Sequence, residues 1–175
     1  MANNPFYRLS EAKDFKVTSE DITDGLFSIS QYSGIFGVKG GNDISPHLKW
    51  SGAPADTKSY TVTMFDVDAP TGSGFWHWAV VNIPASINEL ATGAGDEYSS
   101  GIPEEAFQLP NDARIAKYIG AAPPTGHGEH RYYIVVHALN VEDIGVAKDG
   151  TPALLGFNIN NHILGRAVII VKAEM

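Results

Sequence analysis

The sequence has no cysteine, few basic residues and no long hydrophobic run, and each of these absences excludes a class of protein. Without cysteine, a disulfide framework, thiolate chemistry and a Cys-based zinc site are impossible. Twelve Lys and Arg against 20 Asp and Glu give a formal charge of −8. This balance argues against a nucleic acid partner and against capture by an anionic membrane surface. No apolar stretch approaches the about 18–20 residues of a bilayer-crossing helix, so we expect no membrane-spanning segment.

What remains is typical of a globular chain. At 175 residues, 43% hydrophobic and 18% charged, it suits a single domain over residues 1–175. The polar N-terminal arm, up to about Phe15, lacks the basic and apolar segments of a signal peptide, so we expect a cytoplasmic protein. The glycines match neither a phosphate loop nor a dinucleotide fingerprint, and we expect no cofactor.

The pattern of β-forming residues predicts an all-β sandwich with small helical additions. Ser59 to Asp66 alternates strictly, so that Tyr60, Val62, Met64 and Asp66 share one face. Residues 16–25 predict a short strand and a turn, and further strands are expected at 47–50, 78–83, 131–139 and 167–171, the last of them buried on both faces or between sheets. Residues 155–164 predict a helix, 86–90 a helical turn capped by Ser86, and 91–115 an ordered surface loop.

Two short stretches concentrate the polar chemistry. The first, DVDAPTGSGFWHW from Asp66 to Trp78, places two carboxylates and a histidine around a Pro/Gly turn. On extended backbone Asp66 and Asp68 point to the same side. If the flanking strands pair, Asp66 and His77 lie near the same end of the sheet. A carboxylate there would fix the tautomer of the histidine and favour its protonated form.

The second stretch, GAAPPTGHGEHRYY from Gly120 to Tyr133, repeats this chemistry ahead of another strand. His130 shares a strand face with Tyr132. Backbone N–H groups of the preceding Pro/Gly loop are expected to form an anion-binding concavity. Taken singly, a histidine or aspartate at a strand end is more often structural. The pairing of two such loops instead predicts that they meet in one small polar pocket.

The two stretches closely resemble the signature regions of the phosphatidylethanolamine-binding protein family, also called the Raf kinase inhibitor-like family, in its bacterial and archaeal branch. Supporting matches are GGNDISPHLKW at 40–50, VVNIP at 80–84 and LGFNINNHILGRA at 155–167. Together they cover nearly the whole chain. The resemblance implies two antiparallel sheets with Greek-key connections, and a pocket that accepts phosphate, acetate or phosphorylated head groups.

The resemblance also implies the residues of the site. The family's polar pocket residues match Asp66, Asp68, His77 and His130, and its pocket walls match Pro70, Trp76, Ala122, Pro123, Pro124, Gly126 and Tyr132. Val67 stands where the family usually has proline, and Ala122 where many relatives have glycine or proline. The C-terminal helix of eukaryotic relatives has no clear match beyond Met175.

Several functions stay open at this point. We favour a binding protein that captures a small anionic group, such as phosphate or a phospholipid head group, between His77 and His130. The alternative is an inhibitor of a protease or kinase that acts through its surface. An enzyme is not expected, because no nucleophile stands out and GSG at 72–74 lacks the G-x-S-x-G elbow. A metal site at Asp66, Asp68, His77 and His130 fits no standard spacing, and relatives suggest a homodimer.

Overall fold

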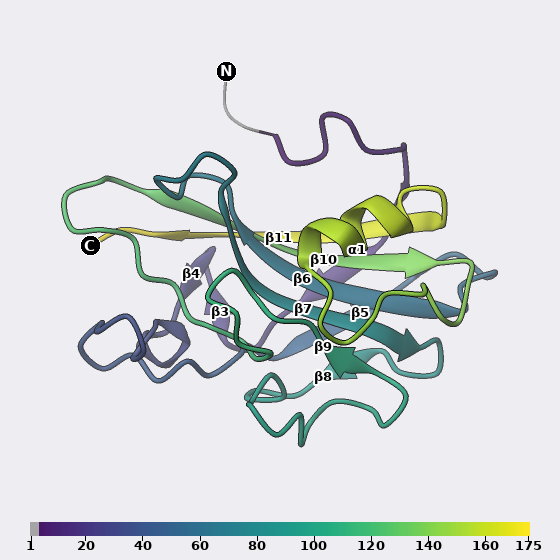
Figure 1. Cartoon of the computed structure of the whole chain (residues 1–175), viewed down its shortest axis with the longest axis horizontal. Coiled ribbons are helices and arrows are strands. Elements are labelled where there is room, and N and C mark those ends of the chain that lie inside the picture. The colour runs from purple at the N-terminus through teal and green to yellow at the C-terminus, as the bar shows by residue number, and fades with distance from the viewer. Residues whose placement is uncertain (1–3) are drawn as a thin grey trace.

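The computed structural model describes residues 4–175, so the first three residues of the predicted N-terminal arm lie outside it. Strands dominate (Figure 1). The elements are β1 (Lys13–Asp14), β2 (Lys16–Thr18), β3 (Ile22–Thr23), β4 (Leu26–Phe27), the 3-10 helix η1 (Ile29–Gln31), β5 (Leu48–Ser51), β6 (Ser59–Asp66), β7 (Phe75–Pro84), β8 (Glu89–Leu90), β9 (Phe107–Gln108), β10 (His130–Leu139), α1 (Pro152–Ile159) and β11 (Ile163–Ala173). The prediction of a β-rich protein with few helices is confirmed.

One large sheet carries most of the strands. Its order is β3-β4-β11-β10-β6-β7-β9, and β1 pairs with β11 as an eighth strand. The three long central strands β10, β6 and β7 are antiparallel neighbours. Two edge pairings, of β11 with β1 and with β4, are parallel, which the expectation of purely antiparallel sheets did not include.

A smaller sheet, ordered β2-β5-β8, packs against the inner face of the large one. The predicted inner face of β6 is confirmed, because Tyr60, Val62 and Met64 are buried in the core between the sheets. Trp50 of β5 enters this core from the smaller sheet, with its ring 5.4 Å from that of Tyr60. The two sheets therefore form the predicted sandwich, and Asp66 lies where the inner face of β6 ends.

The outer face of the large sheet is covered by α1, which crosses it in Figure 1. The helix starts at residue 152 rather than the predicted 155, because Thr151 caps it: the Thr151 hydroxyl accepts from the amide of Leu154 at 3.1 Å. Proline at the first helical position suits this start. Leu155 and Ile159 bury the packed side of α1, at roughly 1.5–3 kcal/mol per fully buried side chain.

Two other local predictions are wrong. Residues 86–90 do not form a helical turn, because Glu89–Leu90 pairs with β5 as strand β8. The last strand is longer than predicted, and of the two predicted alternatives it has burial between the sheets, on one face, rather than burial on both faces. Ala167 and Val171 are buried while Val168 and Ile170 are exposed, as expected of a strand with one face toward solvent.

Candidate functional site

A cavity of about 150 Å³ lies where β6 ends and β7 and β10 begin. Antiparallel pairing brings these ends together: Asp66 lies opposite Phe75 of β7 and Tyr132 of β10. The two stretches singled out in the sequence thus meet at one end of the sheet. The cavity is lined by Phe36, Asp66, Ala69, Pro70, Thr71, Phe75, His77, Ala122, Pro124, His130 and Tyr132.

Asp66 and His130 form a buried pair at the base of the site. Nδ1 of His130 donates to Oδ2 of Asp66 at 2.7 Å, with the residues 1% and 3% exposed. The other carboxylate oxygen of Asp66 accepts from the amide of Asp68 at 2.9 Å. Both oxygens of Asp66 are therefore engaged, which satisfies a carboxylate in a buried position. The predicted use of a carboxylate to fix a histidine tautomer applies to His130.

His77 reaches the cavity through an irregularity in β7. Met64 pairs with Trp78 and Phe65 with Trp76, so His77 falls between two consecutive pairs as the extra residue of a β-bulge. Its Nδ1 donates to the carbonyl of Ile119 at 3.0 Å. Burial lowers the pKa of His77, and this outweighs the opposing effects of the Ile119 carbonyl and Asp66. His77 is therefore neutral near pH 7, contrary to our expectation of a protonated histidine.

Tyr132 supplies a hydroxyl without a fixed partner. Its side chain is fully buried and lines the cavity, yet its hydroxyl makes no hydrogen bond of ordinary geometry to residues 4–175. Asp66 and the backbone of Ala122 are still close enough to act on it, and burial, with a smaller effect of Asp66, raises the pKa of Tyr132. A buried hydroxyl without a partner is costly to a protein, and a ligand that accepts a hydrogen bond would remove that cost.

His127 is a functional candidate that the sequence analysis missed. It is exposed in the loop before β10, and its Nδ1 lies 2.7 Å from Nε2 of His130. Together with Asp66 this makes a chain of three side chains, in which both ring nitrogens of His130 have partners. The spacing H-x-x-H was a visible signal, but the loop between the two histidines gave no periodicity from which to place His127.

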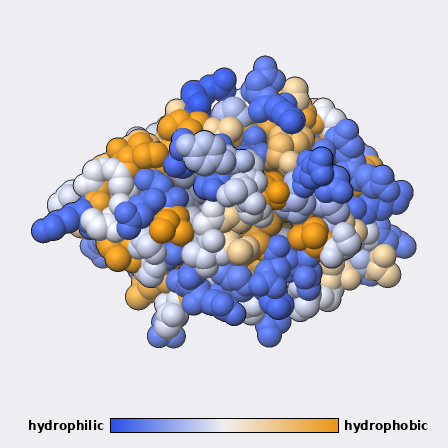
Figure 2. Space-filling model, turned by 90° about the horizontal axis from the view of Figure 1, so that it is seen from below, coloured by the Kyte–Doolittle hydropathy of each residue, from blue (hydrophilic) through white to orange (hydrophobic). Residues whose placement is uncertain are grey.

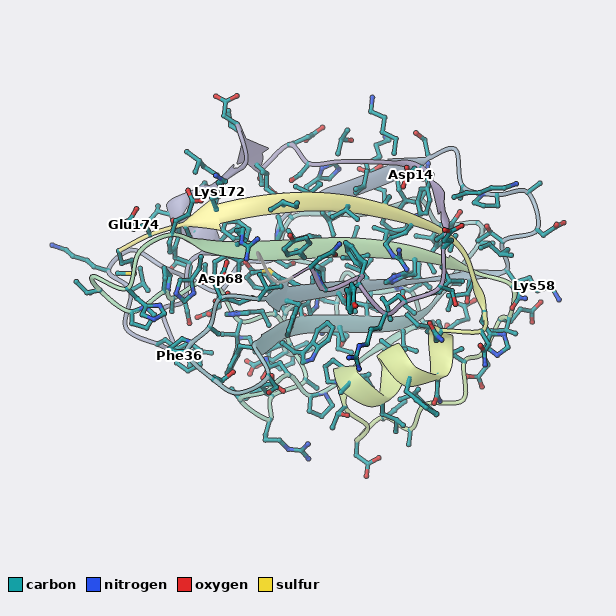
Figure 3. All side chains as sticks on the ribbon, turned by 90° about the horizontal axis from the view of Figure 1, so that it is seen from above. Asp14, Phe36, Lys58, Asp68, Lys172 and Glu174 are labelled. Atoms are coloured by element: carbon teal, nitrogen blue, oxygen red, sulfur yellow. The ribbon has the colours of Figure 1, made fainter. Side chains whose placement is uncertain are left out.

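The Asp68 side chain is not part of the hydrogen-bonded series formed by Asp66, His130 and His127. Its carboxylate forms a bidentate pair with Arg131, at 2.7 Å to Nε and 2.8 Å to Nη2, and also accepts from the backbone amide of Arg131. Hydrogen bonding to Arg131 lowers the pKa of Asp68. Asp68 borders a separate and larger hollow, beside the N-terminal arm. Figure 3 shows Asp68 near the same end of the molecule as Phe36, which lines the cavity.

The predicted walls divide into two groups. Pro70, Ala122 and Pro124 line the cavity with Tyr132. Trp76 is turned to the outer face by the bulge at His77, where its ring lies 4.3 Å from that of Phe65.

Pro123 and Gly126 also lie outside the lining. The amide of Gly126 donates to the carbonyl of Met175 at 2.8 Å, and the amide of His127 donates to the carbonyl of Pro124 at 3.0 Å. These two loop amides are therefore not free to form the expected anion-binding concavity.

The charge of the cavity is set by one acidic residue. Within residues 4–175 its lining includes Asp66 but neither Lys nor Arg. The described residues hold no group of three or more His, Asp or Glu suited to a metal ion. They also include no helix with the length and hydrophobicity needed to cross a bilayer.

Fold and site together define a β-sandwich protein with a small pocket at the strand ends, lined in part by Asp66, His77 and His130. The family model described as phosphatidylethanolamine-binding protein matches residues 18–174. Protein YbcL of Escherichia coli K12 is 44% identical over 168 residues, which cover 95% of this chain and 91% of YbcL. Protein YbhB of the same organism is 44% identical over 156 residues, covering 88% and 96%. The chain belongs to the phosphatidylethanolamine-binding protein family.

Solved structures agree with this assignment. The crystal structure of E. coli YbcL, described as a new member of the mammalian family, superposes with a TM-score of 0.88 at 42% identity, and covers 93% of this chain and 99% of that one. A carboxypeptidase Y inhibitor, in complex with its cognate proteinase, gives a TM-score of 0.55 at 18% identity, and covers 93% and 84%. The latter likeness extends to the fold alone.

Proposed function

We propose that this protein is a binding protein for small anionic groups, and that the cavity at Asp66, His77, His130 and Tyr132 receives a phosphate or a phosphorylated head group. The observation that carries the proposal is the hydroxyl of Tyr132, a residue that lines the cavity: it is buried and makes no hydrogen bond of ordinary geometry to residues 4–175. A ligand oxygen is the group that this donor requires. No chemical conversion of the ligand is part of the proposal.

The chemistry of the lining narrows the ligand class. With Asp66 as the charged group and His77 neutral, the cavity does not attract anions by net charge. Affinity must come from hydrogen bonds to a few oxygens and from the apolar walls, including Phe75 and Pro70. This favours a compact oxyanion or the phosphoryl end of a head group. A long anionic polymer requires a row of cations that the lining does not offer.

Replacement of Tyr132 by phenylalanine tests the proposal most sharply. The change removes one oxygen atom and keeps the ring, so the free energy of unfolding should stay the same or rise, because no hydrogen bond of ordinary geometry within residues 4–175 is lost. Affinity for phosphate and for phosphoethanolamine, measured by calorimetry, should fall about tenfold, as expected for one lost hydrogen bond to a charged ligand. An unchanged affinity would remove the basis of the proposal.

Two further variants complete this test. His77→Ala should abolish measurable binding, because it removes the ring that forms one wall of the cavity. Tyr118→Phe is the matched control: the Tyr118 hydroxyl is also buried but donates to the carbonyl of Gln31 at 2.8 Å, away from the cavity lining. This control should lose about 1 kcal/mol of stability and keep full affinity.

Inhibition of a protease remains the alternative, in view of the carboxypeptidase Y inhibitor that shares the fold. On the face seen in Figure 2, hydrophobic residues form separate spots among hydrophilic ones rather than one broad patch. Large protein interfaces usually centre on a contiguous apolar patch, so this face does not favour a protein target. A panel of proteases and kinases assayed with this protein tests the alternative, and light scattering tests the expected homodimer. The cytoplasmic location stays a prediction.

A further inference from the structure

The hydrogen bonds of His130 leave it no free nitrogen for a ligand. Nδ1 donates to Asp66, so in the neutral ring Nε2 is an acceptor, and it is already occupied by Nδ1 of His127 at 2.7 Å. An anion needs a donor at this ring. His130 can provide this donor only when its Nε2 carries a proton and is no longer hydrogen-bonded to His127.

We propose that His127 competes with the anion for Nε2 of His130, so that binding releases His127 toward solvent and takes up one proton. The proposal rests on the proposed function, since it concerns the same cavity. In the ligand-bound state Asp66 accepts from Nδ1, and the ligand accepts from the newly protonated Nε2. The proton comes from water or buffer, and the positive ring then lies between two negative groups.

The loop that carries His127 can make this movement. Gly126 and Gly128 flank the histidine with φ angles of +77° and +90°, and neither has an atom within 4 Å of where a Cβ would lie. His127 itself is exposed. The loop ends are anchored by the Gly126 amide on the carbonyl of Met175 and by the ion pair of Glu129 with Lys172, at 2.9 Å. Rotation of one exposed side chain between these anchors leaves the fold intact.

The charges around His130 are consistent with one added proton. Asp66 is the carboxylate in direct contact, and its two oxygens both accept hydrogen bonds. Two nearby pairs of opposite charge are Asp68 with Arg131 and Glu129 with Lys172. Asp66 from β6 bonds His130, Tyr132 from β10 stacks on His130, and His77 from β7 contacts Tyr132. A backbone oxygen of Met175, next to Glu174, accepts from the amide of Gly126 beside His127.

Sulfate and inorganic phosphate are the probes that test this coupling. Sulfate carries no proton near neutral pH, so any proton taken up with it is bound by the protein. We expect calorimetry at pH 7.5, in two buffers of different ionisation enthalpy, to give about one proton per sulfate. Affinity should then fall about tenfold per pH unit above neutrality, as linkage requires for one proton. Affinity independent of pH would overturn the proposal.

His127→Ala removes the competitor and should strengthen sulfate and phosphate binding about three- to tenfold, the equivalent of one ordinary hydrogen bond. Thr125→Ala, an exposed position in the same loop, is the control and should leave affinity unchanged. Nitrogen-15 spectra of the wild type should show Nε2 of His130 gaining a proton as sulfate is added. Unchanged or weakened binding in His127→Ala would overturn the competition. If the wild type binds neither ion between pH 5.5 and about 8, both this inference and the proposed function fail.

Discussion

Nδ1 of His130 lies 2.7 Å from Oδ2 of Asp66, although the two residues are 64 positions apart in the chain. Antiparallel pairing of β6 with β10 produces this contact, because Asp66 is directly opposite Tyr132 and therefore two residues from His130. The pair fixes which ring nitrogen of His130 carries a proton. All further chemistry of the cavity depends on that assignment.

Asp66→Asn should weaken the hydrogen bond between residue 66 and His130 while keeping the size and shape of the side chain. An amide replaces the carboxylate that accepts from His130 and from the amide of Asp68, so two charge-assisted hydrogen bonds become weaker. We expect the free energy of unfolding to fall by about 1–3 kcal/mol in urea titrations. Nitrogen-15 spectra should show both neutral tautomers of His130. A single, unchanged tautomer would mean that another group orients the ring.

Asp68→Asn should show that Asp68, unlike Asp66, contributes to stability and not to ligand binding. Because Asp68 pairs with Arg131 outside the cavity, phosphate affinity should change less than about twofold. The Asp68–Arg131 pair is only partly exposed and bidentate, so stability should fall by about 1 kcal/mol, at the upper end for ion pairs near the surface. Calorimetry and urea titration of the same sample measure both. A large loss of affinity would assign Asp68 to the ligand site, as the sequence analysis predicted.

Gly120→Ala should disturb the backbone of the segment that leads to Ala122 in the cavity wall. A Cβ at residue 120 would lie 2.3 Å from the carbonyl carbon of Tyr32 and 2.4 Å from the carbonyl oxygen of Gln31. Backbone atoms cannot give way as a flexible side chain can, so we expect a loss of about 1–3 kcal/mol or more, with weaker phosphate binding. Gly72→Ala is the control, since a Cβ there meets no atom within 4 Å, and it should change stability by less than about 0.5 kcal/mol. Equal effects in the two variants would contradict the close packing at Gly120.

His137 should make the protein sensitive to acid. Burial, with a smaller contribution from Arg166, lowers the pKa of His137 to about 3. Nε of Arg166 donates to Nε2 of the ring, so Nδ1 carries the proton, and this buried group has no partner among residues 4–175. The unfolded chain binds a proton near pH 6.5, whereas the folded chain does not until about pH 3.

His137 should therefore lower the stability of the folded protein in acid. Stability is highest above the unfolded pKa and falls as the pH drops from about 6.5 toward 3, because the unfolded state gains the proton first. Between pH 7 and 4.5 the loss from this one group is about 2–3 kcal/mol. His137→Gln should flatten the pH dependence of urea unfolding over this window. The same slope in the variant and the wild type would show that other groups cause the acid sensitivity.

Much of the fold was predictable because its strands are strongly patterned. The alternation in β6 gave the correct bounds and the correct inner face, since successive side chains of a strand point to opposite faces. Apolar spacing alone places the start of α1 at residue 155, whereas Thr151 and Pro152, which form the cap, set it at residue 152. The pair Glu89–Leu90 reads as a turn in isolation and becomes a strand only through its pairing with β5.

The sequence by itself determined the class of fold, the acidic balance of the chain and the two polar stretches that meet in one cavity, because strand periodicity and turn residues act locally. Tertiary structure alone decided the roles within that cavity. The bulge at His77 turned Trp76 outward, Arg131 drew Asp68 away, and the loop placed His127 on His130. Each of these outcomes depends on which residues of distant strands lie opposite one another, and that register is fixed only when the sheets pack.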